Sequence, residues 1–248
     1  GISAKAEIMG GTDLIICYST GYFRMHGIAS NAGILPVGDA NSIVMRLAKE
    51  ILPAAKDTPV IAAVFANDPF RDMRTFLKEL ADMGFSGVQN FPNMSAYDGK
   101  VSGRFASAGF TSDKEVEMIR IAHDMDLLTT PYVWSKEEAV NMVNAGADAI
   151  VVHLAMTVGG SNGVDKKNVL SLEDSCKYIQ DIRDEVVKLR DDVIVIAHGG
   201  AVAYPEDLQY VLSHTKGVHG FYGASSVERI PVEKAISECV RAFKNTTY

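Results

Sequence analysis

Short apolar runs alternate with longer amphipathic stretches along the whole chain, and this order predicts an α/β protein built as a (β/α)8 barrel. The apolar runs are continuous rather than alternating, which is typical of parallel strands covered on both faces. Several runs end at glycine-rich turns, as barrel strands do where a loop begins. The chain has 248 residues and 47% hydrophobic content, so we expect residues 1–248 to form a single barrel domain.

The strands are expected wherever an apolar run is bounded by turn residues. Seven such runs occur, at Asp13–Ser19, Pro59–Phe65, Ser86–Phe91, Leu127–Val133, Asp148–Leu154, Val193–His198 and Gly217–Tyr222. Helical periodicity between and after them predicts helices at Asn41–Leu52, Asp72–Met83, Asp113–Asp126, Lys136–Ala145, Leu172–Leu189, Pro205–His214 and Val232–Lys244.

Capping signals support these helix boundaries. The sequence Ser135-Lys-Glu-Glu138 has the pattern of a capping box, and Pro205 suits a first helical turn. Gly84 and Gly146 stand where two of the helices should end.

A closed barrel has eight strands, so the seven expected here leave one place to be filled. The opening segment Ser3–Gly11 has the character of a helix that ends at glycines, and a barrel helix follows a strand. We therefore expect the first barrel strand to lie upstream of Gly1, which makes the seven runs strands two to eight. An open doubly wound sheet is the alternative architecture.

Composition narrows the classes of partner. The net charge of −7 argues against nucleic acid, and we expect no membrane partner because no apolar run approaches the roughly 18 residues of a membrane span. The three cysteines, Cys17, Cys176 and Cys239, are far apart and lack zinc-type spacing. We expect reduced thiols and a cytoplasmic location.

Two glycine-rich turns follow the last two predicted strands. In barrels of this class, the loops after strands seven and eight and a short extra helix often bind phosphate through backbone N–H groups. We predict that Ser225–Arg229 forms this short helix and that Pro231 lies in the first turn of the next one. The predicted phosphate ligands are Gly199, Gly200, Gly223, Ala224, Ser225 and Ser226. The alternative is that glycine simply ends these strands.

Four side chains near strand ends are candidates for catalysis. His153 and His198 end adjacent predicted strands and could each transfer protons, or could be structural histidines. Arg24 lies in a long loop that runs to Asp39, where it could clamp a carboxylate or phosphate, or remain a surface arginine. Asp68 could bind a metal, act as a base or cap the following helix.

The remaining candidates would contact the ligand. Tyr22, Asn90 and Tyr132 follow predicted strands, and Gly159 and Gly160 lie in a loop that could close over a ligand. The segment 92–109 is expected to be a second lid or a surface loop. No lysine lies on a predicted strand and no GxSxG motif occurs, which argues against Schiff-base and serine-nucleophile chemistry.

A set of short sequences resembles the phosphoenolpyruvate hydrolase-like family of TIM barrels, whose members include the C-terminal half of plant tobamovirus-resistance proteins. The sequences are Gly38-Asp-Ala-Asn-Ser-Ile-Val, Thr58-Pro-Val-Ile-Ala, Asp68-Pro-Phe, Gly87-Val-Gln-Asn-Phe-Pro, Glu115-Val-Glu-Met-Ile, Leu128-Thr-Thr-Pro-Tyr, His198-Gly-Gly and Gly220-Phe-Tyr-Gly-Ala-Ser-Ser. The resemblance covers essentially the whole chain and implies a strand before Gly1.

The resemblance implies a phosphoenolpyruvate/pyruvate-type barrel that acts as a hydrolase or lyase on a small phosphorylated or phosphonylated oxoacid, with Mg²⁺ as the implied cofactor. Asp68 is then the best candidate for a metal ligand, although the acid-rich metal motif of such barrels is missing. Two alternatives stay open: a barrel without turnover that senses a phosphate ligand or binds a protein, and a flavin-phosphate barrel. We expect a homo-oligomer or part of a longer parent chain.

Overall fold

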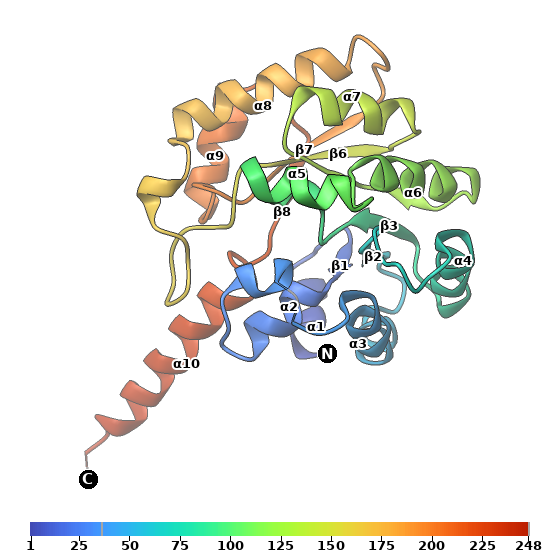
Figure 1. Cartoon of the computed structure of the whole chain (residues 1–248). Coiled ribbons are helices and arrows are strands. Elements are labelled where there is room, and N and C mark those ends of the chain that lie inside the picture. Colours follow the sequence, from blue (N-terminus) through green and yellow to red (C-terminus); the bar gives the residue numbers. More distant parts are fainter. Residues whose placement is uncertain (36, 248) are drawn as a thin grey trace.

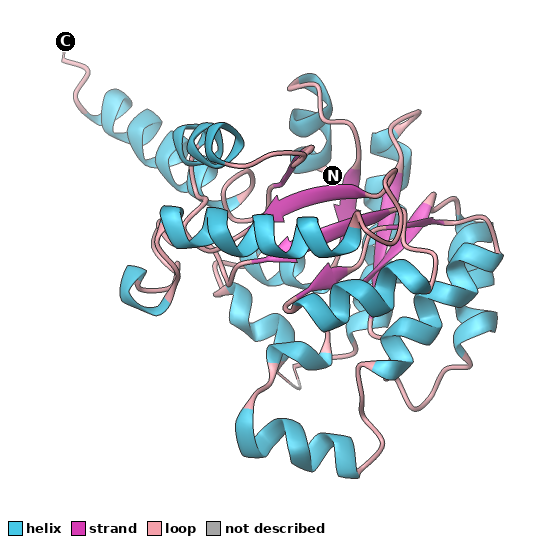
Figure 2. Cartoon of the chain, turned by 90° about the horizontal axis from the view of Figure 1, so that it is seen from above, coloured by secondary structure: helices cyan, strands magenta, loops and turns pink. Residues whose placement is uncertain are grey.

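The computed structural model describes residues 1–35 and 37–247, and parallel strands form its centre with helices around them (Figures 1 and 2). The strands are β1 (Ile15–Cys17), β2 (Val60–Val64), β3 (Gly87–Asn90), β4 (Leu128–Thr129), β5 (Tyr132–Val133), β6 (Ala149–His153), β7 (Ile194–His198) and β8 (Gly220–Tyr222). They pair in the orders β1-β2-β3-β4 and β5-β6-β7-β8, and every pairing is parallel. The barrel-type α/β fold predicted from the sequence is confirmed.

The strand predicted at Leu127–Val133 is divided into β4 and β5. Pro131 lies at the division, and proline has no N–H to give to a sheet ladder. The backbone nevertheless stays bonded on both sides, because Thr130 N–H donates to Val88 (3.1 Å) and Val151 N–H donates to Pro131 (2.9 Å). The two short strands therefore occupy one strand position, and each of the seven predicted runs contains a strand.

Ten α-helices occur in the described residues. They are α1 (Ile2–Met9), α2 (Ser19–Met25), α3 (Ala40–Ala55), α4 (Met73–Met83), α5 (Gly99–Ser107), α6 (Asp113–Asp124), α7 (Lys136–Asn144), α8 (Leu172–Val186), α9 (Pro205–His214) and α10 (Arg229–Lys244). Short 3-10 helices form at η1 (Ser30–Ile34), η2 (Met94–Ala96) and η3 (Lys166–Asn168). The helix expected at Ser3–Gly11 is present as α1.

The predicted caps are confirmed, with one change of partner. Ser135 accepts the Glu138 N–H, while the Glu138 carboxylate accepts the N–H of Trp134 rather than that of Ser135. Gly84 adopts a left-handed conformation with φ of 105° at the end of α4, which glycine reaches without the steric cost of a Cβ.

Three segments between the strands and the main helices differ in secondary structure from what the sequence predicts. The long loop expected after Ser19 contains α2 and η1, and the segment 92–109 contains η2 and α5. Residues 225–228 form a turn that leads directly into α10, so no separate short helix exists there, although Pro231 does lie in the first turn of α10. The glycines in the first two segments do not prevent helix formation, because a helix tolerates isolated glycines at a modest cost.

The apolar core lies between the strands and the surrounding helices, whereas the barrel interior is aromatic and polar. Helix α8, for example, buries Ile179 and Ile182 against the outer face of the sheet, and α4 buries Leu77 and Leu80. A separate inner cluster contains Tyr18, Phe91, Tyr132 and Tyr222, and the fully buried Gln89 lies on β3. The inner cluster brings polar side chains to the carboxyl ends of the strands.

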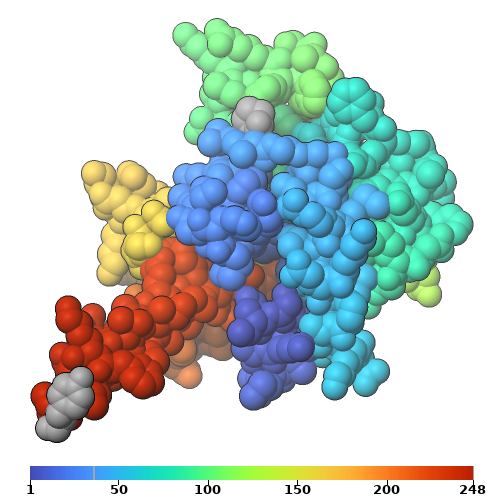
Figure 3. Space-filling view, turned by 90° about the horizontal axis from the view of Figure 1, so that it is seen from below, coloured from blue at the N-terminus to red at the C-terminus, as the bar shows by residue number. Residues whose placement is uncertain are grey.

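Helix α10 projects from the body of the molecule (Figures 1 and 3). Of its residues only Arg229 is buried, while Val232, Ile236, Val240 and Phe243 are exposed. Its base, next to the last strand, nevertheless contributes side chains to the site described below. Strands β1 and β8 each have one hydrogen-bonded neighbour, and the strand expected upstream of Gly1 stays a prediction. No helix in the described part of the chain is long and apolar enough to cross a membrane.

Candidate active site at the carboxyl ends of the strands

A small cavity of about 10 Å³ lies at the carboxyl ends of the strands. Its walls come from the ends of β1, β3 and β5 to β8, from α2 and η1, and from the loop after β6. The lining residues are Tyr18, Thr20, Arg24, Ser30, Phe91, Tyr132, His153, Met156, Thr157, His198, Ala224 and Ser225. The sequence-predicted residues that the structure brings together here are His153, His198, Tyr132, Arg24, Ala224 and Ser225.

His198 has a defined tautomer. Its Nδ1 lies 2.8 Å from the carbonyl oxygen of Tyr222, which can only accept, so Nδ1 carries the proton. Nε2 is then an acceptor, and the Tyr132 hydroxyl, 3.2 Å away, donates to it. Burial lowers the pKa of His198 to about 4, so the ring is neutral at pH 7.

His153 lies beside His198, with their ring centroids 4.8 Å apart. The indole of Trp134 stacks on the other face of the His153 ring, at a centroid distance of 3.9 Å and an interplanar angle of 18°. Burial, reinforced by His198, lowers the pKa of His153 well below its usual range. Its Nδ1 is buried and has no hydrogen-bond partner among the described residues, so a neutral proton acceptor or donor is free for a ligand.

Arg24 reaches the cavity from α2 and is only 3% exposed. Glu228, at the base of α10, accepts from both Nε (2.6 Å) and Nη2 of Arg24, and the guanidinium lies 5.0 Å from the Tyr18 ring centroid. Although burial opposes the charge, Tyr18 and Glu228 together raise the pKa of Arg24. The predicted carboxylate clamp is therefore at the site, but its charge is already balanced by a residue that the sequence did not indicate.

The glycine turns after β7 and β8 differ in whether their backbone N–H groups are available to bind an anion. The Gly200 N–H donates to the Ala155 carbonyl oxygen (2.8 Å), so its predicted role as a phosphate donor is wrong. Gly199 and Gly200 are needed for close packing, because a Cβ at Gly199 would lie 2.2 Å from the Ala155 carbonyl oxygen.

In the second turn, the N–H groups of Ala224 and Ser225 make no hydrogen bond within the described residues, and both residues line the cavity. Gly223 allows the tight turn, since a Cβ there would meet the Val227 side chain at 2.2 Å. The Ser226 hydroxyl is buried and finds no hydrogen-bond partner in the part of the chain that the structure describes. This turn keeps its predicted capacity to bind an anion.

Ala155 follows β6 with a φ of 148°, a conformation that L-residues rarely adopt. Its carbonyl oxygen accepts a hydrogen bond from the Gly200 N–H, and this bond to the neighbouring glycine turn stabilises the strained conformation. Strained backbone of this kind persists where packing enforces it, and it often borders functional sites.

Asp68 lies outside the cavity. Its carboxylate accepts from Asn41 Nδ2 (2.9 Å), from the Phe70 N–H (2.9 Å) and from Arg71, which also pairs with Asp39. The oxygens that a divalent cation would need are engaged by these donors and by the charge of Arg71. No group of three or more His, Cys, Asp or Glu side chains in the described ranges could hold a metal ion. The residues present therefore do not fit the implied Mg²⁺.

The other predicted contact residues have structural partners. Tyr22 faces Arg46, whose guanidinium lies 4.4 Å from its ring centroid, on the outer side of α2. The prediction that Asn90 contacts a ligand is wrong. Its side chain forms hydrogen bonds with Glu115 (2.8 Å) and with both backbone groups of Tyr132, so its amide group is occupied within the protein. Gly159 and Gly160 pack on Arg229 at the base of α10 and do not line the cavity.

The site contains three side chains that the sequence did not predict. Trp134 stacks on His153, and Glu228 pairs with Arg24. Thr20 lines the cavity with a buried hydroxyl that has no partner in the described chain. Glu228 lies two residues after the second glycine turn, and that proximity is the only signal in the sequence that could have indicated it.

The model of the family described as phosphoenolpyruvate hydrolase-like matches residues 1–246. The chain belongs to this family. It is 51% identical over 245 residues to the ToMV resistance and susceptible proteins of Solanum lycopersicum, covering 99% of this chain and 32% of theirs. It therefore spans about a third of the length of these curated relatives. It is also 31% identical over 246 residues to a putative transcriptional regulatory protein of Sinorhizobium fredii, covering 99% of this chain and 40% of that one.

A solved structure confirms the fold. The chain superposes on 2,3-dimethylmalate lyase, of the PEP mutase/isocitrate lyase superfamily, with a TM-score of 0.60 at 13% identity, covering 97% of this chain and 78% of that one. At this identity the likeness establishes the barrel architecture and leaves the chemistry to the site itself.

Proposed function

We propose that this barrel is an enzyme that acts on a small phosphorylated or phosphonylated oxoacid of phosphoenolpyruvate type, as a hydrolase or lyase. The observation that carries the proposal is the buried group of His153, His198 and Tyr132 around one cavity at the carboxyl ends of the strands. Catalytic residues of such barrels come from these strand ends.

The histidine and tyrosine geometry suits proton transfer. His198, oriented by Tyr222, accepts the hydrogen bond of the Tyr132 hydroxyl and fixes its position, while burial raises the pKa of Tyr132 well above its ordinary value, so the phenol keeps its proton. His153 supplies a second neutral nitrogen without a protein partner. Two neutral imidazoles in a buried site can accept and return a proton next to an enolate-like oxygen.

Anion binding would come from two directions. The free N–H groups of Ala224 and Ser225 would hold the phosphate, and Arg24 would hold the carboxylate, either by sharing its guanidinium with Glu228 or by exchanging partners. Planar guanidinium groups bind carboxylates through two parallel hydrogen bonds, which also fixes the orientation of the substrate.

Substrate entry would require the loop after β6 to move. The cavity of about 10 Å³ has room for about one water molecule, and Met156 and Thr157 form part of its wall. The loop continues through Gly159 and Ser161 and is fastened to α10, where Glu233 accepts from the Ser161 N–H (2.9 Å). We propose that this loop opens to admit the substrate and closes to exclude water during reaction.

The enzyme proposal is tested by following pyruvate and phosphate release from phosphoenolpyruvate, with and without Mg²⁺, alongside the variant His198→Asn. Turnover that the variant abolishes while retaining its melting temperature supports the proposal. No product at any concentration that demonstrably binds contradicts it.

A second candidate is a barrel that binds the same ligands without turnover. It is favoured by the Arg24–Glu228 pair, because a charge already neutralised within the protein contributes less to stabilising a transition state. Stabilisation of the protein by phosphoenolpyruvate, beyond that given by phosphate or pyruvate, in the absence of product would select this candidate.

A further inference from the structure

A second and much larger pocket, of about 630 Å³, lies at the barrel mouth on the side of β1 to β3. Its walls come from residues 33–35 and 37–40 after α2, from residues 65–70 after β2, and from the segment between Pro92 and Phe110 after β3. Figure 3 shows these segments, in blue, teal and green, meeting on one face of the molecule. The volume falls in the range of about 300–1,000 Å³ that is usual for small-molecule sites.

The walls are mostly aromatic and aliphatic, and several of the side chains remain in contact with solvent. Leu35 is 56% exposed, Val37 is 50% exposed and Phe70 is 93% exposed. Concentrated exposure of this kind around a concave surface is uncommon in a soluble protein and marks a binding site. Helix α5, which contributes Phe105, buries none of its residues.

The pocket wall also contains the buried side chain of Ser19. Ser19, at the start of α2, lines the pocket and is 2% exposed, yet its hydroxyl has no hydrogen-bond partner among the described residues. A buried hydroxyl without a partner is costly, and a ligand that donates or accepts a hydrogen bond would remove that cost.

The charges of the pocket also restrict the occupant. Two carboxylates line it, those of Asp39 and Asp68, and Arg71 forms ion pairs with both of them. The three groups together carry one net negative charge, so a carboxylate or phosphate would be disfavoured here, while a neutral or cationic group would be accepted.

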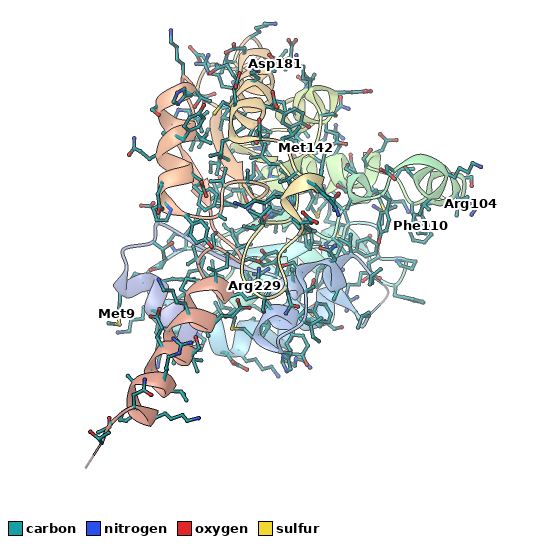
Figure 4. The ribbon with its side chains drawn as sticks, turned by 90° about the vertical axis from the view of Figure 1, so that its left-hand side faces the viewer. Met9, Arg104, Phe110, Met142, Asp181 and Arg229 are labelled. Carbon is teal, nitrogen blue, oxygen red and sulfur yellow. The ribbon has the colours of Figure 1, made fainter. Side chains whose placement is uncertain are left out.

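We propose that this pocket binds an apolar small molecule that is neutral or cationic and that carries one hydrogen-bonding group for Ser19. The site is separate from the histidine cavity: Ser19 faces the pocket while its neighbour Thr20 faces the cavity, and likewise Gly33 and Ser30 of η1 line opposite sides. Figure 4 shows Phe110, in the pocket wall, well apart from Arg229, whose helix base borders the cavity. The proposal does not depend on the chemistry of the histidines.

The test uses two fluorescent probes, neutral Nile red and the anionic anilinonaphthalene sulfonate, titrated into the whole chain. We expect Nile red to bind with a blue-shifted emission and the anionic probe to bind on the order of tenfold more weakly, as repulsion by the pocket carboxylates requires. Equal binding of both probes, or binding of neither, would overturn the proposal.

Two matched variants locate the bound probe. Leu35→Asp places a charge in the pocket wall, and Leu189→Asp places the same charge at a similarly exposed leucine outside the pocket lining (49% exposed). Leu35→Asp should weaken Nile red binding on the order of tenfold, and Leu189→Asp should leave it unchanged, since burying an unpaired charge against a ligand is costly. Equal effects of the two variants, or a dimer whose formation displaces the probe, would show that the pocket is not a small-molecule site.

Discussion

The two sides of the barrel mouth are built in opposite ways. On the β5–β8 side, polar side chains surround a cavity of about 10 Å³; His198 and Tyr132 are bonded within the protein, while His153 Nδ1 and the Thr20 hydroxyl have no partner among the described residues. On the β1–β3 side, apolar side chains surround about 630 Å³ and remain partly exposed. The first arrangement holds polar groups in fixed positions, as the proposed chemistry on a small polar molecule requires, whereas the second presents a large apolar surface with few polar groups. Under the two proposals, one ring of strand ends supports two kinds of recognition.

The largest loss of stability is expected when one member of the Arg24–Glu228 ion pair, beside the histidine cavity, is replaced. Glu228→Gln leaves Arg24 buried without a counter-charge, because the Arg24 side chain is 1% exposed. We expect a loss of about 3–5 kcal/mol in the free energy of unfolding, measured by urea denaturation. Lys78→Gln breaks the exposed pair with Asp82 and serves as the control, with an expected change below about 1 kcal/mol. Similar losses for both variants would mean that Arg24 does not need Glu228.

Acidic pH should lower the free energy of unfolding through the buried histidine His198. The pKa of His198 falls from 6.5 in the unfolded chain to about 4 in the fold, so the unfolded state binds a proton first as pH decreases. Stability is full above pH 6.5 and declines between 6.5 and about 4, by about 3 kcal/mol for this group alone. Unfolding measured across this range should show a shallower slope in His198→Asn. An identical slope in the variant would contradict a buried neutral histidine.

A smaller loss of stability is expected when a side chain is added at Gly199, where the backbone packs closely against Ala155. Gly199→Ala places a Cβ 2.2 Å from the Ala155 carbonyl oxygen at a φ of 77°, and we expect a loss of about 2–4 kcal/mol. Gly109→Ala is the control, because its φ is 84° but no atom lies within 4 Å of the added Cβ. The control should lose only about 1–2 kcal/mol. Thermal unfolding of both variants separates crowding from backbone strain, and equal losses would show that the contact is not tight.

The smallest effect is expected on the apolar side. Phe70→Ala should change the free energy of unfolding by less than about 0.5 kcal/mol, because the side chain is 93% exposed. Phe76→Ala, at a phenylalanine that is 3% exposed, should cost about 3–5 kcal/mol. A large loss for Phe70→Ala in urea denaturation would mean that this side is packed in solution, and the contrast between the two sides would fail.

The fold was accessible from the sequence because its signals are local. Continuous apolar runs such as Val60–Val64 become fully buried strands, and caps such as Ser135 act on residues three positions away. Glycine was the misleading signal, since the segments around Gly33 and Gly103 form helical turns rather than open loops.

The site was accessible only in part because its defining contacts are distant in sequence. His153 and His198 were found from their positions at strand ends, and the register of β6 with β7 places them directly opposite each other. The pair of Arg24 and Glu228 joins residues 204 positions apart, and no local pattern indicates it. The backbone donors could not be assigned from sequence either, because Gly200 and Ala224 both belong to glycine-rich turns, yet among the described residues the Gly200 N–H has an acceptor and the Ala224 N–H has none.

The most direct test of the account is a calorimetric titration of phosphoenolpyruvate into the unaltered protein, His198→Asn and Leu35→Asp. We expect phosphoenolpyruvate to bind the unaltered protein and Leu35→Asp with equal affinity, and to bind His198→Asn at least tenfold more weakly because the tautomer that orients Tyr132 is lost. Binding that survives in His198→Asn and disappears in Leu35→Asp would place the oxoacid on the apolar side and contradict the assignment of the histidine cavity.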